Sequence, residues 1–119
     1  MVTLFAFLVR REGMTHEEFL TYWREQHGPL IRDTPALARH LVRYEQHARI
    51  PGGNGGSPEY DGVAVQVFES WAEFVAMISE PEAQLMSDDE ANFLDHDGLR
   101  VVFSEDVVTM VDAHGAVDG

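Results

Sequence analysis

Hydrophobic side chains recur every three or four residues in the first third of the chain, a spacing typical of a helix with one buried face. The positions that share this face are Phe19, Tyr22, Trp23, Gln26, His27, Leu30 and Ile31. Thr15 and Glu18 have the spacing of a capping box, so we expect the helix to begin there. Gly28 and Pro29 predict a break or kink, because glycine suits a left-handed helix end and proline cannot donate the next backbone hydrogen bond. The pattern therefore places His27 near a helix end, partly inside the protein.

Four extended segments and a second helix are predicted in the rest of the chain. The extended segments are residues 3–10, 39–50, 62–68 and 99–111. The second helix has an apolar stripe made of Trp71, Phe74, Val75 and Ile78. Ser70 and Glu73 form its capping box, and the helix is expected to falter around Pro81. Ser87 and Glu90 repeat the capping pattern, which predicts that a short helical segment begins there.

The predicted order is strand, helix, strand, strand, helix, strand, which is the βαββαβ arrangement of ferredoxin-like α+β folds. Its four-stranded antiparallel sheet carries the helices on one face. The segment 3–10 is apolar on both faces, so the second face of the sheet also needs cover, and a second copy of the chain can supply it. We therefore expect a homodimer of one domain, residues 1–112, followed by a flexible tail, residues 113–119.

The composition narrows the choice of partners. The chain has 119 residues and a net charge of −13, from 21 acidic residues against eight basic ones, all of them arginine. A negative field repels phosphate backbones and anionic lipid headgroups, so neither nucleic acid nor a membrane surface is an expected partner. The apolar run 2–9 is too short to cross a bilayer, and Arg10 and Arg11 follow it, so it does not resemble a signal peptide. Without cysteine there is no disulfide and no thiolate nucleophile, and a cytoplasmic location is expected.

His27 is the first candidate for chemistry, and its position allows two interpretations. Burial disfavours the imidazolium form, whereas the negative end of a helix dipole favours it. A histidine held between these two influences can act as a general acid or base near neutral pH. The alternative is a structural histidine whose ring nitrogens simply satisfy neighbouring groups at the helix end.

The other histidines do not predict a metal site. His40 and His47 are seven residues apart, a spacing that puts them on opposite faces of a regular strand. Asp95 and Asp97 flank His96, but adjacent residues rarely converge on one ion, so no metal is expected. The glycine-rich stretch 52–57 lacks the Gly-Lys-Ser/Thr ending of a phosphate-binding loop and is expected to join two strands.

The helix with its Thr-x-x-Glu cap resembles the signature helix of the EthD family, within the dimeric α+β barrel superfamily. The motif that carries the resemblance is Phe19-x-x-Tyr22-Trp23-x-x-x-His27-Gly28-Pro29-Leu30. Residues 88–95, ahead of a last strand that contains Glu105, extend it over about the whole domain. The resemblance implies a homodimer in which two four-stranded sheets face each other around a barrel, with a cavity for a small, mostly apolar or aromatic metabolite.

What the resemblance implies about function spans several reactions. Relatives in the superfamily include polyketide cyclases and dehydratases, isomerases and cofactor-free monooxygenases, and in relatives that dehydrate or cyclise a histidine matching His27 is the usual candidate acid or base. If the protein is an enzyme, the resemblance implies a cofactor-independent lyase, isomerase or monooxygenase of the dimeric α+β barrel type. The function we expect from it is that of a dehydratase, cyclase or isomerase acting on a small apolar or polyketide-like carbonyl compound, with His27 moving the proton.

Four further residues are candidates for binding the substrate: Tyr22, Trp23, His40 and Tyr44. For the three aromatic residues, core packing is the alternative role. Two other functions stay open from the sequence. One is a non-catalytic protein that binds a small molecule or supports an oxidative degradation pathway, and the other is an oligomerisation module whose barrel its own side chains fill.

Overall fold

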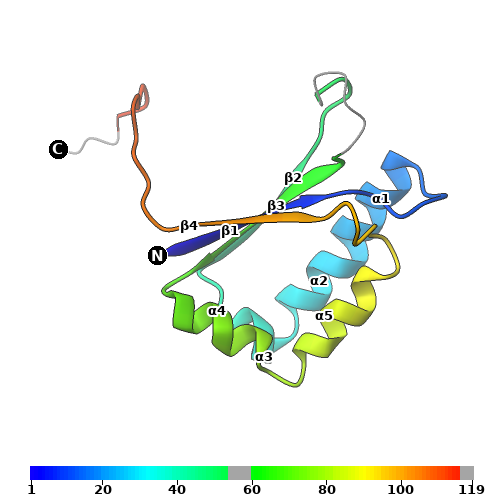
Figure 1. The fold of residues 1–119 in the computed structure, drawn as a ribbon, viewed down its shortest axis with the longest axis horizontal. Coiled ribbons are helices and arrows are strands. Elements are labelled where there is room, and N and C mark those ends of the chain that lie inside the picture. The colour runs from blue at the N-terminus through cyan, green and yellow to red at the C-terminus, as the bar shows by residue number, and fades with distance from the viewer. Residues whose placement is uncertain (54–59, 116–119) are drawn as a thin grey trace.

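Four antiparallel strands form a single sheet in the computed structural model, which describes residues 1–53 and 60–115 (Figure 1). The strands are β1 (Val2–Leu8), β2 (Arg43–Ala48), β3 (Gly62–Phe68) and β4 (Arg100–Ser104). Their order across the sheet is β2-β3-β1-β4. The helical elements are α1 (His16–Tyr22), the π-helix η1 (Trp23–His27), α2 (Gly28–Arg32), α3 (Pro35–Ala38), α4 (Trp71–Ile78) and α5 (Ala83–Glu90). The predicted ferredoxin-like α+β fold is confirmed.

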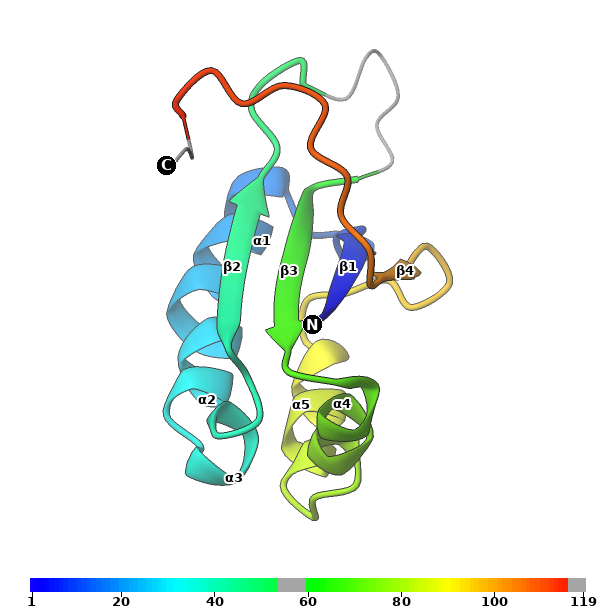
Figure 2. The ribbon, with the colours of Figure 1, turned by 90° about the vertical axis from the view of Figure 1, so that its left-hand side faces the viewer.

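The helices cover one face of the sheet, as Figures 1 and 2 show from two directions. On β1 the side chains that point to the helices are buried: Val2, Leu4, Ala6 and Leu8. Aromatic rings fill the space between the two layers, and Phe19, Trp23, Phe68 and Phe93 are each at most 1% exposed. These rings form the hydrophobic core between the sheet and the helices.

The opposite face of the sheet is also apolar at its centre. Strand pairing puts Phe5 of β1 beside Val65 of β3 and Val102 of β4. These side chains are partly or fully exposed, and no helix of the described residues lies over them (Figure 1). The prediction that the first strand, β1, is apolar on both faces is thus confirmed. No helix of the described residues covers the second face.

The first helix begins as predicted but does not end where the sequence suggests. Thr15 and Glu18 form the complete capping box. The predicted break at Gly28 and Pro29 is wrong, because Gly28 has an ordinary helical φ of −58° and the helix continues to Arg32. The disturbance is instead the π turn of η1, which lies directly before Gly28.

Three other boundaries differ from the sequence predictions. Residues 39–42 are not strand, because Pro35 starts the short helix α3, and His40 lies in the turn before β2. Ser87 lies inside α5 instead of capping a new helix. Within the described residues β4 pairs with β1 alone, and it ends at Ser104, which pairs with Thr3 near the start of β1.

Two segments lie outside the described residues, 54–59 and 116–119. Most of the glycine-rich stretch 52–57 and the end of the predicted tail 113–119 fall in them, so the division at residue 112 stays a prediction. In the part of the chain that is described, no helix has the length and apolar character needed to cross a membrane.

Candidate active site

His27 and Asp89 meet where the first helical segment packs against α5. His27 is the last residue of η1 and is 7% exposed, while Asp89 lies near the end of α5. The Nδ1 atom of His27 lies 2.8 Å from Oδ2 of Asp89. The ring of Phe93 packs against the imidazole, with ring centroids 4.7 Å apart. A carboxylate and an aromatic ring therefore hold the imidazole in one orientation.

Asp89 is itself held by two further side chains. The Tyr22 hydroxyl donates to Oδ1 of Asp89 at 2.5 Å, and the Asn92 amide donates to the same oxygen at 3.2 Å. Burial raises the pKa of Asp89, but the hydrogen bonds from Tyr22, His27 and Asn92 outweigh it and leave the pKa below its ordinary value. Burial and the bond to Asp89 raise the pKa of Tyr22, which keeps the phenol protonated as a donor. Asp89 is thus a carboxylate at neutral pH.

The protonation state of His27 follows from the same contacts. Burial lowers the pKa of His27, and the hydrogen bond and charge of Asp89 offset this only in part. The imidazole is therefore neutral near pH 7. Because the Asp89 carboxylate only accepts hydrogen bonds, it selects the tautomer in which Nδ1 carries the proton. The lone pair is then on Nε2, the atom that a general base would use.

An apolar cavity of about 180 Å³ lies between the sheet and the helices beside His27. Its polar lining consists of His27, Tyr44, Gln66 and Glu90. The apolar lining includes Leu4, Leu8, Trp23, Ile31, Phe74, Met86 and Phe93. His27 lines this cavity, and its Nε2 atom makes no hydrogen bond to the described residues.

Glu90 adds a second titratable group to the cavity. Burial raises the pKa of its carboxyl group above the ordinary value, with a small opposing influence from His96. Its Oε1 atom lies 3.4 Å from Nε2 of His96. The pKa values of these two neighbouring carboxyl groups of α5 are therefore shifted in opposite directions. Asp89 stays ionised, whereas Glu90 takes up a proton more readily.

The structure brings two of the four predicted substrate-binding residues to the cavity. Trp23 is 1% exposed and lines it, and Tyr44 lines it from β2. Tyr22 is not part of the lining, because its hydroxyl is directed to Asp89. His40 lies elsewhere, with Nδ1 at 2.8 Å from Glu73 and Nε2 at 2.7 Å from Glu80.

The sequence analysis missed Asp89 as the partner of His27, and Glu90 and Gln66 as cavity residues. Asp89 is 62 positions from His27, and no local spacing links the two. The segment 88–95 was included in the family resemblance, so it was the one available signal. The described residues hold no cluster of three or more histidine or carboxylate side chains arranged to bind a metal ion.

Comparisons with known proteins agree with this architecture. The EthD domain profile matches residues 11–97 of the chain. An EthD family protein from Bacillus halodurans is 20% identical with a TM-score of 0.68, and the match covers 90% of this chain and 99% of that one. An EthD-like protein from Ralstonia eutropha is 20% identical with a TM-score of 0.67, over 90% of this chain and 92% of the other.

A third solved structure is described as a dimeric protein of unknown function with a ferredoxin-like fold, from Bacteroides fragilis. It is 15% identical with a TM-score of 0.65, over 87% of this chain and 94% of the other. No functionally curated protein matches the sequence. Because the domain profile spans most of the chain and includes both His27 and Asp89, the protein belongs to the EthD family.

Proposed function

We propose that the protein is a cofactor-free proton-transfer enzyme that dehydrates, cyclises or isomerises a small apolar carbonyl compound. The observation that carries this proposal is the neutral His27 imidazole, which lines an apolar cavity, is bonded to Asp89 through Nδ1 and has no hydrogen-bond partner at Nε2 among the described residues. A base within reach of a carbon–hydrogen bond and a donor for the neighbouring oxygen are sufficient for this chemistry. Both kinds of group are present in the cavity lining.

In the proposed first step, Nε2 of His27 takes a proton from the carbon next to the substrate carbonyl. The carbon–hydrogen bonding electrons move into the carbonyl to form an enolate, and the imidazolium that results is stabilised by Asp89. The Gln66 amide and the Tyr44 hydroxyl are the groups placed to donate a hydrogen bond to the enolate oxygen. The imidazolium then returns the proton, either to another carbon in isomerisation or to a leaving hydroxyl in dehydration.

The cavity volume limits the size of the substrate. A cavity of about 150 Å³ accommodates a benzene ring, so about 180 Å³ accommodates one substituted ring or a short branched chain. A polyketide-like substrate with several fused rings would require the cavity to widen. The proposal therefore favours a compact apolar or aromatic metabolite.

We also propose that the protein works as a homodimer, with the uncovered sheet faces of two copies packed together. Phe5, Val65 and Val102 form the centre of this face, and isolated apolar faces of this kind mark association sites. The Bacteroides fragilis protein of the same fold is described as dimeric. Val65→Asp should yield a monomer by analytical ultracentrifugation, and an unchanged dimer would reject this face as the interface.

The test of proton transfer uses 5-nitrobenzisoxazole, a small apolar ring whose opening needs only a base. Removal of its ring proton forms the nitrile and breaks the nitrogen–oxygen bond, which releases a coloured phenolate. His27→Gln should lower the rate by at least about 100-fold, the scale expected for loss of a positioned general base. His114→Gln is the matched control, because His114 is exposed in the C-terminal segment and does not line the cavity. Equal rates for the wild type and His27→Gln would reject the assigned role.

The competing candidate is a non-catalytic binding protein, which the mainly apolar cavity lining favours. The same probe separates the two functions. A binding protein would retain 5-nitrobenzisoxazole without opening its ring faster than a buffer of equal basicity does, and His27→Gln would leave the affinity unchanged.

A further inference from the structure

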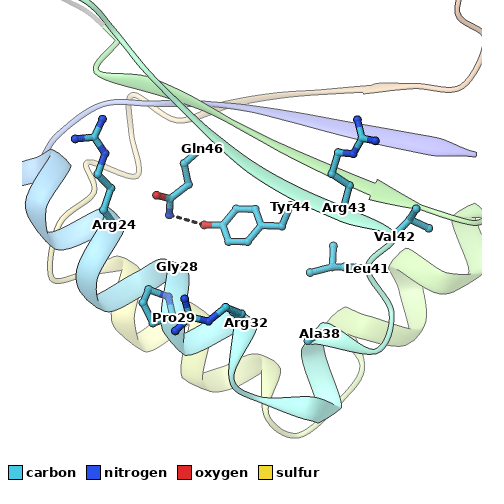
Figure 3. Close-up of a pocket in the computed structure, with 10 residues that line it drawn as sticks. All are labelled: Arg24, Gly28, Pro29, Arg32, Ala38, Leu41, Val42, Arg43, Tyr44 and Gln46. Atoms are coloured by element: carbon cyan, nitrogen blue, oxygen red, sulfur yellow. Dashed lines mark hydrogen bonds between the residues drawn. The ribbon is translucent and has the colours of Figure 1, made fainter.

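A second and larger hollow lies outside the cavity, between the first helical segment and the edge strand β2 (Figure 3). It has a volume of about 480 Å³ and is called the arginine groove below. The residues that line it are Arg24, Gly28, Pro29, Arg32, Ala38, Leu41, Val42, Arg43, Tyr44 and Gln46. Because β2 is at the edge of the sheet, no neighbouring strand closes this side.

The charge of the arginine groove is opposite to that of the protein. Three of the eight basic residues of the chain line it, and no acidic residue of the described segments does, although the whole chain has a net charge of −13. In Figure 3, Arg24 and Arg43 stand at the two ends of the upper rim, with Tyr44 and Gln46 between them. Such a local concentration of cations attracts an anion that the rest of the surface repels.

The three arginines differ in how far they are already neutralised. Arg24 has no carboxylate partner among the described residues, whereas Arg43 lies 3.7 Å from Glu45. Arg32 is held by Asp33 through two contacts of 2.8 Å each. Arg24 therefore has the most capacity to bind a ligand, Arg43 has less, and Arg32 has least.

The floor of the groove is apolar, and the polar side chains of its inner wall already make hydrogen bonds to each other and to the backbone. Pro29, Ala38, Leu41 and Val42 supply hydrocarbon surface. Gln46 donates from Nε2 to the backbone oxygen of Trp23 at 2.9 Å and to the hydroxyl of Tyr44 at 3.0 Å. Tyr44 lines both the groove and the inner cavity, so an occupant of the groove touches a ring that also bounds the cavity.

We propose that the arginine groove binds an amphiphilic anion, meaning an apolar organic molecule with a carboxylate or similar oxyanion. The hydrocarbon part lies on the apolar floor, and the oxyanion accepts hydrogen bonds from Arg24. Arg43 alternates with Tyr44 along β2, so its side chain belongs to the other face of the sheet and contributes only positive charge at the far end of the rim. This binding does not depend on proton transfer by His27.

The test compares two fluorescent probes that differ by one charged group. 8-Anilinonaphthalene-1-sulfonate carries a sulfonate, and N-phenyl-1-naphthylamine is the same skeleton without it. Arg24→Gln should raise the Kd of the sulfonate probe about fivefold and that of the neutral probe by less than about twofold. Arg32→Gln should have a smaller effect on the sulfonate probe, because Asp33 already occupies Arg32.

Controls separate this site from general effects and from the proposed catalysis. Arg11→Gln removes the same charge from an arginine outside the groove and should leave both probes unchanged. His27→Gln should retain the affinity for the sulfonate probe even where it abolishes proton transfer. Equal weakening by Arg11→Gln, or parallel loss of both probes in Arg24→Gln, would overturn the proposal.

A measurement on the wild-type protein keeps the test independent of how the variants fold. The sulfonate probe should shift the NMR signals of the Gly28 amide and of the Gln46 side-chain amide, which both line the groove. Its Kd should rise as sodium chloride is increased from about 0.05 M to about 0.5 M, because salt screens exposed charges. Binding that leaves both signals in place would assign the probe to another surface and reject the groove.

Discussion

His27 and His40 both lie against carboxylates, yet the two sites have opposite properties. His27 has one carboxylate partner, Asp89, and is buried deeply enough that the pKa of its imidazole is lowered. His40 has two carboxylate partners, and hydrogen bonds from its ring to Glu80 and Glu73 raise the pKa of its imidazole. One ring is neutral with a nitrogen still available, and the other is charged with both nitrogens occupied.

The difference shows what distinguishes a candidate base from a structural ion pair. His40 ties the turn before β2 to Glu73 of α4 and to Glu80 just beyond that helix, so its contacts link segments of the fold. Among the described residues His27 makes one hydrogen bond, which orients its ring, and the residue lines a cavity. Proximity to a carboxylate is therefore not the informative feature, whereas an unused nitrogen beside an apolar space is.

Asp89→Asn should have the largest effect of the changes that test this comparison. The amide cannot stabilise the imidazolium and can favour the wrong tautomer of His27, so opening of 5-nitrobenzisoxazole should slow about 100-fold. Asp88→Asn is the matched control, because Asp88 is exposed and bonds to Gln84. An unchanged rate in Asp89→Asn would show that the carboxylate has no part in positioning the base.

His40→Gln should lower stability and leave the chemistry intact. Loss of the two contacts to Glu73 and Glu80 should reduce the Tm by about 5 °C in a thermal scan followed by circular dichroism. The rate with 5-nitrobenzisoxazole should stay within about twofold of the wild type. A rate loss as large as that of His27→Gln would return His40 to the list of substrate-contacting residues.

Tyr22→Phe should produce a smaller loss of rate, about threefold to tenfold. The variant removes one hydrogen bond to Asp89 and leaves those from Asn92 and His27 in place. With one donor fewer, the Asp89 carboxylate should hold the proton on His27 more strongly, so the pKa of His27 and the acidic limb of the rate profile that it sets should rise. A profile that does not move would show that Tyr22 serves packing alone.

The smallest and most direct effect is the titration of the two rings themselves. Followed by the NMR signal of the ring Cε1 proton, His27 should titrate below about 6.5 and His40 above it. Both midpoints at the ordinary value would remove the electrostatic distinction between the sites.

The two titrations have opposite consequences for stability. The stabilisation from charged His40 is complete below about pH 6.5 and is lost as the pH rises through its raised folded-state pKa. The contribution of neutral His27 is complete above about pH 6.5 and is lost as the pH falls toward its lowered folded-state pKa. Urea unfolding of the wild type, His27→Gln and His40→Gln across this range measures both slopes.

Local patterns predicted most of the fold. The capping box at Thr15, the strand at residues 62–68 and the helix after Ser70 depend on contacts within a few residues, and each was predicted from the sequence. The errors occur where distant partners decide the outcome. The length of the last strand depends on where β1 ends, and His40 was assigned to a strand because the short helix at Pro35 has too few residues to show a period.

The candidate site was predictable only in part for the same reason. His27 was identifiable because the helical stripe predicted its burial. Its partner Asp89 approaches from another helix, and the open nitrogen and the cavity arise only when β1, β3 and the helices pack together. The spacing of residues in the sequence does not show that His27 and Asp89 are in contact.

The π turn of η1 has a consequence for how the chain can change in length. Tyr22 and His27 are five residues apart, and in a regular α-helix that spacing would put their side chains about 140° apart around the axis. The wider turn absorbs one residue, so both side chains reach the same carboxylate of Asp89. A chain without the exposed Glu25 would bring the same pair together at a spacing of four in an unbroken α-helix. The turn therefore acts as a one-residue insertion that leaves the hydroxyl and the imidazole facing the same partner.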